Sequence, residues 1–483
     1  MLFELNSTFS PQERYDVCII GAGAAGIVLA RKLARAGQSV LLAEAGGVEY
    51  SDQSQSIYQG DVIGDPYPDL DIARLRYFGG STNHWGGVCR PLDRRDFQPK
   101  RYTTYTTWPI EPDDLAPYLD ETCAVLGLDP IPDDVPLPGT QDLQQMFWRY
   151  AGRLRLGEEY FEEIKNDDYV SLLLNANFSG FQIQEDQITT ANFLNYDRYH
   201  FAIEAKYFVL ACGGIENCRL LLIENQKWNN SLGNSSKMVG KYFMEHPHFT
   251  IGEHYLYRDH PFQPTDDEEF NLTPTQDFME RTEILNCRIT LDLDQPRQGW
   301  RGFVQSAMCN VAPEMSASLM EAMGRRFICG GTVRATWEQE PRVENRIALA
   351  EDVDFFGRPR ARMIWRKSEL DKKIFTTLAL RVAQYLAEVD GGRLRFYDWV
   401  LDPDGEYPVR GKLAAKHHMG GTRMATSPRD GVVDKDCRVF GMANLFVAGS
   451  SVFPNGGQSN PTLTIVELSL RLADFLSGEL REV

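Results

Sequence analysis

A glycine-rich turn near the N-terminus has the residue types and spacing that can cradle a diphosphate. It reads Gly21-Ala22-Gly23-Ala24-Ala25-Gly26, a GxGxxG pattern. Glycines permit a tight turn and close approach of the diphosphate, whose negative charge meets the N-terminus of the helix that follows. Glu44 stands 18 residues after Gly26, where a carboxylate can accept hydrogen bonds from a ribose diol. The turn and the acid predict a dinucleotide site, and alone they do not separate FAD from NAD.

A C-terminal block carries groups that could move a proton. It reads Lys416-His417-His418-Met419-Gly420-Gly421-Thr422-Arg423-Met424, then Gly449-Ser450-Ser451, then Gln458-Ser459-Asn460-Pro461-Thr462-Leu463-Thr464. Histidine titrates near neutrality, so its neutral form can accept a proton at working pH. The Asn460 amide can donate to a substrate oxygen but cannot act as a base. Because Asn460 precedes Pro461 and an apolar helical pattern, it also resembles a helix N-cap, and the two roles are compatible.

A second glycine-rich run reads Phe78-Gly79-Gly80-Ser81-Thr82-Asn83-His84-Trp85-Gly86-Gly87. Its backbone could pass close to a flat ring system, and the same composition also fits an irregular loop. Residues 46–128 around it contain no long periodic segment, which predicts extended loops lying over a bound molecule.

The elements that must position these residues can be read from apolar patterns. Residues 15–20 and 39–44 predict buried strands on either side of a helix that ends near Gly37, which makes a βαβ unit. Residues 207–212 predict another buried strand of the same parallel sheet, followed by a helix over 215–224. A last strand over 444–448 and a last helix over 461–476 complete the pattern.

Taken together, the N-terminal unit, the second glycine run and the C-terminal block resemble the glucose-methanol-choline (GMC) family of FAD-dependent oxidoreductases. The resemblance is closest to the branch of the pyranose oxidases and the large subunits of gluconate and fructose dehydrogenases. Met244-Glu245-His246-Pro247 and Leu210-Ala211-Cys212-Gly213-Gly214-Ile215-Glu216-Asn217 support it. The match covers most of the chain and is loose over residues 250–410.

The resemblance implies a mechanism. A histidine accepts the substrate hydroxyl proton while hydride passes from the same carbon to flavin N5. The family histidine precedes a Gly-Thr pair by three residues, which selects His418, and its family partner matches Asn460. His417 is interpreted as a packing or turn-orienting residue. If Asn460 opens a helix beneath the flavin, the helix dipole favours the anionic reduced ring.

The motifs and the resemblance predict FAD as the cofactor. Its predicted contacts are Gly21, Gly23, Ala24, Ala25, Gly26, Glu44, Ala45, Gly79, Gly80, Ser81, Asn83, His84, Trp85, Gly86, Ala211, Gly449, Ser450, Pro461 and Thr462. In similar pyranose oxidases the histidine of a Ser-Thr-His-Trp run carries the flavin covalently. Here Asn83 is inserted into that run, and we favour noncovalent binding, with a covalent link at His84 as the alternative.

The predicted fold class is α/β, with a Rossmann-like FAD-binding domain and a substrate domain built on an antiparallel sheet. The FAD-binding domain is expected to be discontinuous, over residues 1–95, 165–245 and 411–483. Residues 96–164 and 246–410 form the substrate domain, where segments such as 346–349 and 361–365 predict antiparallel strands. Residues 263–277, with four consecutive acids and two prolines, are expected to be a surface loop, or less favourably a substrate lid.

Composition excludes several classes of partner. A formal net charge of -18 disfavours nucleic acid and anionic lipid. No apolar run is long enough for a transmembrane helix, and residues 1–14 lack the features of a secretory signal. Nine scattered cysteines without a CxxC pair suggest neither a disulfide framework nor a zinc cage, and His246 and His248 alone do not predict a metal site. We therefore expect a soluble, cytoplasmic protein.

The sequence thus predicts FAD-dependent oxidation of a small-molecule alcohol, such as a sugar, a glycoside or another secondary alcohol. Two alternatives stay open: a flavoenzyme of specialised metabolism acting on a non-sugar substrate, and a subunit that delivers electrons to a partner protein. No motif identifies the electron acceptor, which could be oxygen or a partner.

Overall fold

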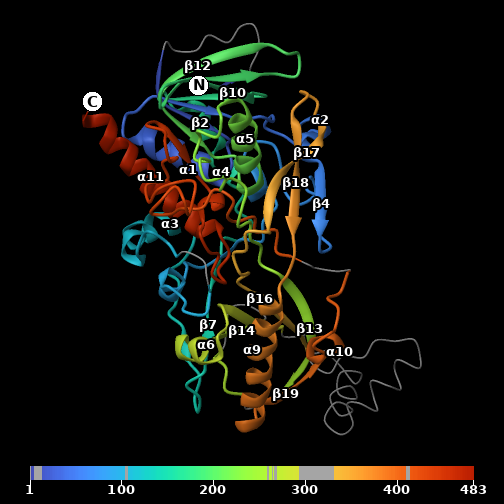
Figure 1. The fold of residues 1–483 in the computed structure, drawn as a ribbon. Coiled ribbons are helices and arrows are strands. Elements are labelled where there is room, and N and C mark those ends of the chain that lie inside the picture. The colour runs from blue at the N-terminus through green and yellow to red at the C-terminus, as the bar shows by residue number, and fades with distance from the viewer. Residues whose placement is uncertain are drawn as a thin grey trace.

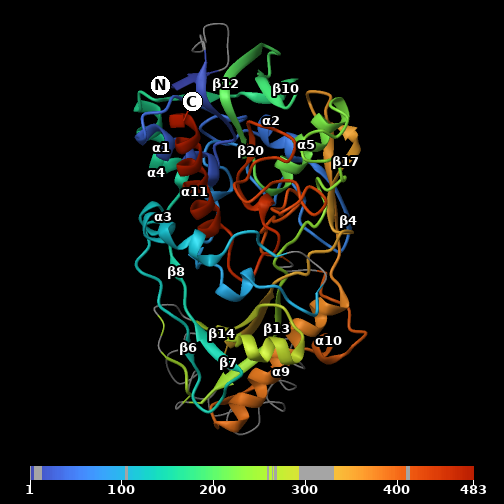
Figure 2. The ribbon, with the colours of Figure 1, turned by 60° about the vertical axis from the view of Figure 1, so that its left-hand side comes forward.

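Two large β-sheets lie at opposite ends of the molecule (Figures 1 and 2). The computed structural model describes residues 2–4, 14–103, 107–257, 260–263, 265, 269–292, 331–409 and 414–482. The first sheet takes strands from the N-terminal half and from near the C-terminus, and the second is built from the middle of the chain.

The first sheet has eight strands and a mainly parallel centre. Its path is β1-β9-β3-β2-β12-β11-β10, and β20 pairs with β12 as well. The strands are β1 (Leu2–Glu4), β9 (Val170–Leu174), β3 (Val40–Ala43), β2 (Tyr15–Ile20), β12 (His200–Leu210), β11 (Gln187–Leu194), β10 (Asn177–Gln184) and β20 (Leu445–Val447). The antiparallel pairings of this sheet are β10 with β11 and β11 with the first half of β12.

Helices cover this sheet and bury its apolar strands. They are α1 (Ala24–Arg35), α4 (Leu156–Asn166), α5 (Gly214–Lys227) and α11 (Thr462–Glu482). The predicted βαβ unit is confirmed as β2-α1-β3, and the last helix begins one residue later than expected. The largest hydrophobic core lies between these elements. The predicted fold class is confirmed.

The second sheet has seven strands, antiparallel throughout, and a long helix packs on one face. Its order is β19 (Gly392–Phe396), β13 (His248–Leu256), β16 (Gly331–Trp337), β15 (Cys287–Asp292), β14 (Glu269–Pro274), β7 (Leu143–Met146) and β6 (Val135–Pro136). The helix is α9 (Glu369–Glu388), which was not predicted from the sequence. Its apolar stripe forms the second core with the sheet.

The prediction of a surface loop over residues 263–277 is wrong for residues 269–274. Residues Glu269–Pro274 form β14, which pairs with β15 on one side and β7 on the other. Asn271 and Thr273 gave this strand a polar appearance, yet both are buried. The Asn271 Oδ1 accepts from Thr290 Oγ1 at 2.7 Å, and Thr273 Oγ1 donates to the Cys287 carbonyl at 2.9 Å. Satisfied polar groups can therefore occupy an inner strand.

A third, three-stranded sheet lies beside α5. The hairpin β17 (Arg346–Val353) and β18 (Pro359–Trp365) pairs in parallel with β4 (Gly60–Gly64). A small apolar core joins it to α5. The strands β17 and β18 belong to the segment 246–410 that was predicted to form the substrate domain, yet they lie beside α5, which covers the first sheet. The limits of the two domains stay a prediction.

The remaining elements are short. They are α2 (Asp52–Gln55), β5 (Val88–Cys89), α3 (Leu119–Leu126), β8 (Arg149–Tyr150), α6 (Gln276–Thr282), α10 (Asp398–Leu401) and the 3₁₀ helices η1 (Ser56–Tyr58), η2 (Gly80–Asn83), η3 (Arg94–Phe97), η4 (Pro112–Asp114), η5 (Ala116–Tyr118) and η6 (Ser450–Val452). Among the described residues, no helix has the length and apolar character needed to cross a membrane.

Candidate functional site

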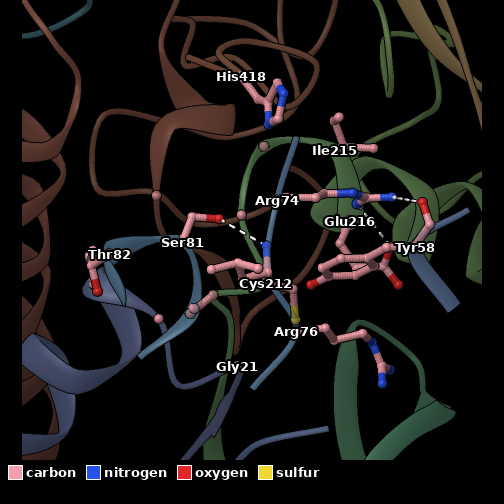
Figure 3. Close-up of a pocket in the computed structure, with 18 of the residues that line it drawn as sticks. Gly21, Tyr58, Arg74, Arg76, Ser81, Thr82, Cys212, Ile215, Glu216 and His418 are labelled. Carbon is pink, nitrogen blue, oxygen red and sulfur yellow. Dashed lines mark hydrogen bonds and ion pairs between the residues drawn. The ribbon is translucent and has the colours of Figure 1, made fainter. Parts of the chain in front are cut away.

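A cavity of about 480 Å³ opens at the carboxyl ends of the first sheet's parallel strands. Ile20 ends β2, Ala43 ends β3, Ala211 follows β12 and Gly449 follows β20, and all four line it. Open α/β sheets bind ligands at this edge, because loops there leave the sheet in opposite directions. Figure 3 shows part of the wall.

The GxGxxG turn forms one wall and is held by Glu44. The Glu44 carboxylate accepts hydrogen bonds from the backbone N–H of Ala22 and Gly46, both at 2.9 Å. Gly21 has a φ of 106°, and a Cβ there would lie 2.7 Å from the Ala211 carbonyl oxygen. Glycine is therefore required at Gly21, and Glu44 keeps acceptor capacity for a ribose.

Several glycines in the wall form a cradle. A Cβ built on Gly23, Gly86, Gly213 or Gly449 would have no protein atom within 4 Å, and all four line the cavity. Side chains there would project into space that a flat cofactor could fill. Helix α1 also begins at this wall without an acid in its first turn, so its N-terminus favours a diphosphate. These features fit FAD.

Three predicted cofactor residues do not line the cavity. A Cβ on Gly26 would come within 1.9 Å of the Gly21 carbonyl oxygen, so Gly26 lets α1 approach the turn. A Cβ on Gly79 would lie 2.4 Å from the Asn83 Oδ1. The Asn83 amide donates to the Phe78 carbonyl at 2.8 Å. We assign Gly26, Gly79 and Asn83 to holding the wall in shape.

The second glycine run lies against the first, because the Gly79 backbone N–H donates to the Ala22 carbonyl at 2.8 Å. Ser81 and His84 line the cavity with exposed side chains, and the Trp85 indole N–H donates to the Leu154 carbonyl at 2.7 Å. The Ser81 hydroxyl accepts from the Leu75 backbone N–H at 3.2 Å, as Figure 3 shows. The covalent or noncovalent state of the flavin at His84 stays a prediction.

Asn460 lies where α11 begins. Its Nδ2 donates to the Val88 carbonyl at 3.2 Å, while its Oδ1 is buried and accepts no hydrogen bond within the described part of the chain. The N-cap interpretation is therefore wrong, because a cap requires that oxygen to accept from the first turn. Asn460, Pro461 and Thr462 all line the cavity, which keeps the amide available to a ligand.

His417 and His418 both line the cavity and are half-buried. His418 Nε2 lies 2.8 Å from the Tyr67 hydroxyl, and His417 Nδ1 lies 2.9 Å from His246 Nδ1. Burial, with the charges of Arg74 and Lys416, lowers the pKa of His418 to about 3. Burial, with the effect of His246, holds the pKa of His417 well below its usual value. Both rings are therefore neutral near pH 7, with one unprotonated nitrogen each.

Two residues of this network were missed in the sequence. The Tyr67 hydroxyl donates to Glu245 Oε1 at 2.7 Å, and Glu245 also accepts from the His246 backbone N–H at 2.7 Å. Burial raises the pKa of Glu245 to about 8. Tyr67 and His418 are 351 positions apart, so no local pattern could have paired them, although Glu245 stood in a motif already noted.

An arginine pair was also missed on the side of the cavity shown in Figure 3. Arg74 pairs with Glu216 at 3.4 Å and lies over the Tyr58 ring, 3.9 Å from its centroid. Arg76 donates to Asn177 Oδ1 at 2.9 Å. All of these residues line the cavity. Arg74 and Arg76 are two positions apart in a chain of net negative charge. Such a pair favours the binding of an anion such as a diphosphate.

The structure brings the other predicted residues together. Those lining the cavity are Gly21, Gly23, Ala24, Ala25, Glu44, Ala45, Gly80, Ser81, His84, Trp85, Gly86, Ala211, Gly449, Ser450, Pro461 and Thr462 for the cofactor, with His418 and Asn460 as the predicted catalytic pair. Their individual roles stay predictions. Within the described ranges, no group of three or more His, Cys, Asp or Glu side chains is placed to hold a metal ion.

Comparison with known proteins gives the family. Residues 341–469 match the family described as GMC oxidoreductase. The chain is 25% identical to the fructose dehydrogenase large subunit of Gluconobacter japonicus, covering 97% of this chain and 98% of that protein. It is 26% identical to the 2-methyl-1,2-propanediol dehydrogenase of Mycolicibacterium austroafricanum, covering 98% and 96%. The structure of an FAD-dependent oxidoreductase from Chaetomium thermophilum matches with a TM-score of 0.58 at 16% identity, over 97% of this chain and 100% of that one. With the cradle, the arginine pair and the paired histidines, these matches confirm the predicted resemblance to the GMC oxidoreductases and support FAD as the cofactor.

Proposed function

We propose that this enzyme oxidises the CH–OH group of a small, polar, polyhydroxylated alcohol such as a sugar or glycoside. The observation that carries the proposal is the cavity itself, which joins a cofactor cradle to two neutral histidines and the Asn460 amide. Relatives support the substrate class, since their names specify fructose and a diol.

The polarity of the second sheet supports a polar substrate. On β15, Cys287, Ile289 and Leu291 pack in the core beneath α9, whereas Arg288 and Thr290 point to the other face. Arg288 Nη1 donates to the Gln458 carbonyl at 2.8 Å, two residues before Asn460. The polar face of the sheet is therefore turned towards the loop that leads to Asn460, and hydroxyl groups would find hydrogen-bond partners there.

The chain's own part in the reaction is to orient the alcohol and take its proton. Bound FAD supplies the acceptor for the hydride that leaves the substrate carbon. A neutral histidine takes the hydroxyl proton, which leaves the electron pair on oxygen to form the carbonyl. The Asn460 amide would hold the substrate oxygen, Glu44 would accept hydrogen bonds from the cofactor ribose, and Arg74 and Arg76 would hold its diphosphate.

An anaerobic screen tests this function. Sugars, glycosides, polyols and simple alcohols are mixed with the holoenzyme, and loss of the oxidised flavin absorbance is recorded. We expect bleaching by members of the polyhydroxylated set and slower bleaching by monohydric alcohols. A flavin that dithionite reduces fully, yet no alcohol in the screen bleaches, contradicts the proposal.

A second candidate concerns the destination of the electrons. The similarity to a protein named a large subunit, over 97% of this chain, favours a partner that accepts electrons. The net charge of -18 would suit a basic partner surface. Oxygen consumption by the isolated enzyme, compared with its rate with an artificial dye, separates the cases: a dehydrogenase reduces the dye and consumes little oxygen.

A further inference from the structure

Arg288 is a buried cation on β15, the central strand of the second sheet. Its exposed fraction is 7%. Burial lowers its pKa to about 10, so the guanidinium still carries its positive charge near pH 7. Its polar contacts within the described ranges are the two oxygens of Gln458 and the face of the Trp148 ring, and none of these is a carboxylate. A buried charge without a counter-charge is costly, so this one needs an explanation.

One edge of the Arg288 guanidinium is free. The hydrogen bonds that it makes to described residues all use Nη1, which donates to the Gln458 carbonyl at 2.8 Å and to its Oε1 at 3.2 Å. Nε is buried and has no acceptor in the part of the chain that the structure describes. Nε and Nη2 share one edge of the planar group, and that edge can donate two parallel hydrogen bonds to a carboxylate.

Arg334 shows how the same face of the sheet treats an arginine that has a structural role. It lies on β16 opposite Thr290, two residues from Arg288 on β15, so both arginines point to the same side. Arg334 pairs with Asp292 and Glu269, and its Nε donates to Asp292 Oδ2 at 2.8 Å. A chain with 68 acidic residues thus neutralises Arg334 and leaves Arg288 with neutral partners.

Arg288 lies beside residues that line the cofactor cavity. Burial holds the pKa of His417 well below its usual value, and the positive charge of Arg288 contributes to this shift, as it does for His246. His417 lines the cavity, and so does Asn460, two residues after Gln458. The backbone between Gln458 and Asn460 spans at most about 7 Å, so one small molecule can reach both Asn460 and Arg288.

The free edge of Arg288 fits a carboxylate better than other groups. It offers two donors and one positive charge, which a carboxylate matches with two oxygens and one negative charge. A neutral hydroxyl would leave the charge uncompensated. A phosphate monoester brings about 1.5 to 2 negative charges and three oxygens, and the neighbouring Arg334 is already paired with two carboxylates.

We propose that Arg288 binds a carboxylate of the substrate, so that the alcohol oxidised by this enzyme is a sugar acid, such as an aldonate or a uronate. The inference rests on the proposed function and narrows it. The Nε–Nη2 edge holds the carboxylate, and the hydroxyl group to be oxidised lies at Asn460 and the cavity histidines. Arg288 selects the substrate and takes no part in the transfer of the hydride or the proton.

Matched substrates test the carboxylate on the wild-type holoenzyme. Anaerobic flavin reduction is measured with gluconate, galactonate and glucuronate, with the amide of each acid, and with neutral sugars and sugar phosphates. We expect at least one acid to reduce the flavin about 10²-fold more efficiently than its amide, because the amide cannot neutralise a buried guanidinium.

The failure of this inference can be told from the failure of the proposed function. Neutral sugars, amides or sugar phosphates that reduce the flavin as efficiently as every acid overturn the carboxylate site and leave alcohol oxidation standing. A flavin that dithionite reduces, yet neither acids nor neutral alcohols bleach, contradicts the proposed function itself.

Variants test whether Arg288 is the residue responsible. Arg288→Gln should lower the efficiency with the acid by about 10²-fold, mainly through weaker binding, and should change the efficiency with the amide little. Arg288→Lys keeps the charge without the two-donor edge and should fall between them. Arg334→Gln is the matched control, since it removes a positive charge from the same face and should keep the wild-type preference for the acid. Flavin content and melting temperature identify any folding defect. Equal losses for acid and amide in Arg288→Gln, or an equal loss of preference in Arg334→Gln, overturn the proposal.

Binding can also be measured without turnover. The reduced holoenzyme cannot oxidise the acid, so calorimetric titration under anaerobic conditions gives its affinity directly. Wild-type enzyme should bind the acid about 10²-fold more tightly than the amide, and Arg288→Gln should bind the two about equally. Equal affinities in the wild type, or a preference for the acid that persists in Arg288→Gln, overturn the assignment.

Discussion

The two ends of the molecule were specified by the sequence in different ways. Within the first sheet, the β2-α1-β3 unit follows local patterns, in which a buried strand, a glycine turn and a helix succeed one another within residues 15–44. The strands β12 and β20 join this unit from far along the chain. The second sheet joins strands from residues 135–396, so its pairing is set by contacts between distant segments. The proposed cofactor site contains the local β2-α1-β3 unit, and we propose that the surface that selects the substrate lies on the second sheet.

Gly26→Val should have the largest effect, and it disrupts the packing of the cofactor-binding end of the molecule. A Cβ there would lie 1.9 Å from the Gly21 carbonyl oxygen, so α1 must move away from the turn that cradles the cofactor. We expect loss of bound FAD and low yield of folded protein, measured by flavin content and melting temperature. Gly23→Ala is the matched control, because its Cβ meets no protein atom within 4 Å. It should fold with a wild-type melting temperature and weaker FAD binding. Normal flavin content in Gly26→Val contradicts the packing account.

Trp337→Ala removes a large side chain from the core between the second sheet and α9. Trp337 is fully buried between the sheet and α9, where it stacks on Phe375 with 4.6 Å between ring centroids. Its removal should cost about 3–5 kcal/mol of unfolding free energy, measured by denaturant titration. Trp337→Phe keeps a ring but loses the hydrogen bond to Asp371 Oδ1, so its cost should be smaller, about 1–3 kcal/mol. Equal costs for the two variants would show that ring packing contributes little.

Glu467→Gln tests whether one buried carboxyl makes the stability of the first end depend on pH. Glu467 is buried on α11, and burial raises its pKa to about 8. The native state therefore holds a proton that the unfolded chain releases near pH 4.5, so this group's stability contribution is full below about pH 4.5 and lost as pH rises through 8. The slope approaches ~1.4 kcal/mol per pH unit for one group. The Glu467→Gln variant should flatten the wild-type decline in stability between pH 5 and 8. Glu479→Gln, which removes a half-buried ion pair with Arg438, should leave that decline in place. An unchanged slope in Glu467→Gln rules this carboxyl out as its source.

The smallest effect concerns the flavin linkage. Acid precipitation of the holoenzyme should leave the yellow colour in the supernatant, because we expect FAD to be held by the cradle without a bond to His84. A yellow pellet that turns colourless in His84→Ala establishes the covalent alternative.

Local signals account for what the sequence predicted well. Glu44 and the GxGxxG turn act within one βαβ unit, so strand, helix and acid could be read together. Helix α9 also carried a readable signal: Ser368 and Asp371 form a capping box ahead of an apolar stripe. It was missed because the surrounding segments alternate as strands do.

Hydrogen bonds between residues far apart in the sequence could not be predicted from it. The partners of His418 and His417 are Tyr67 and His246, which lie 351 and 171 positions away. Choosing between adjacent histidines requires knowing which nitrogen each partner covers, and a motif does not contain that information. Asn460 shows the same limit, since its position before Pro461 resembled a cap that the folded chain does not form.

The most direct test of the central claim is stopped-flow reduction of the bound flavin, without oxygen, by a substrate carrying deuterium on the carbon that is oxidised. We expect full bleaching, at a rate that saturates with substrate concentration and falls when deuterium replaces the C–H hydrogen. Bleaching at the same rate with C–H and C–D, together with an unchanged rate in a variant lacking both His417 and His418, would contradict it.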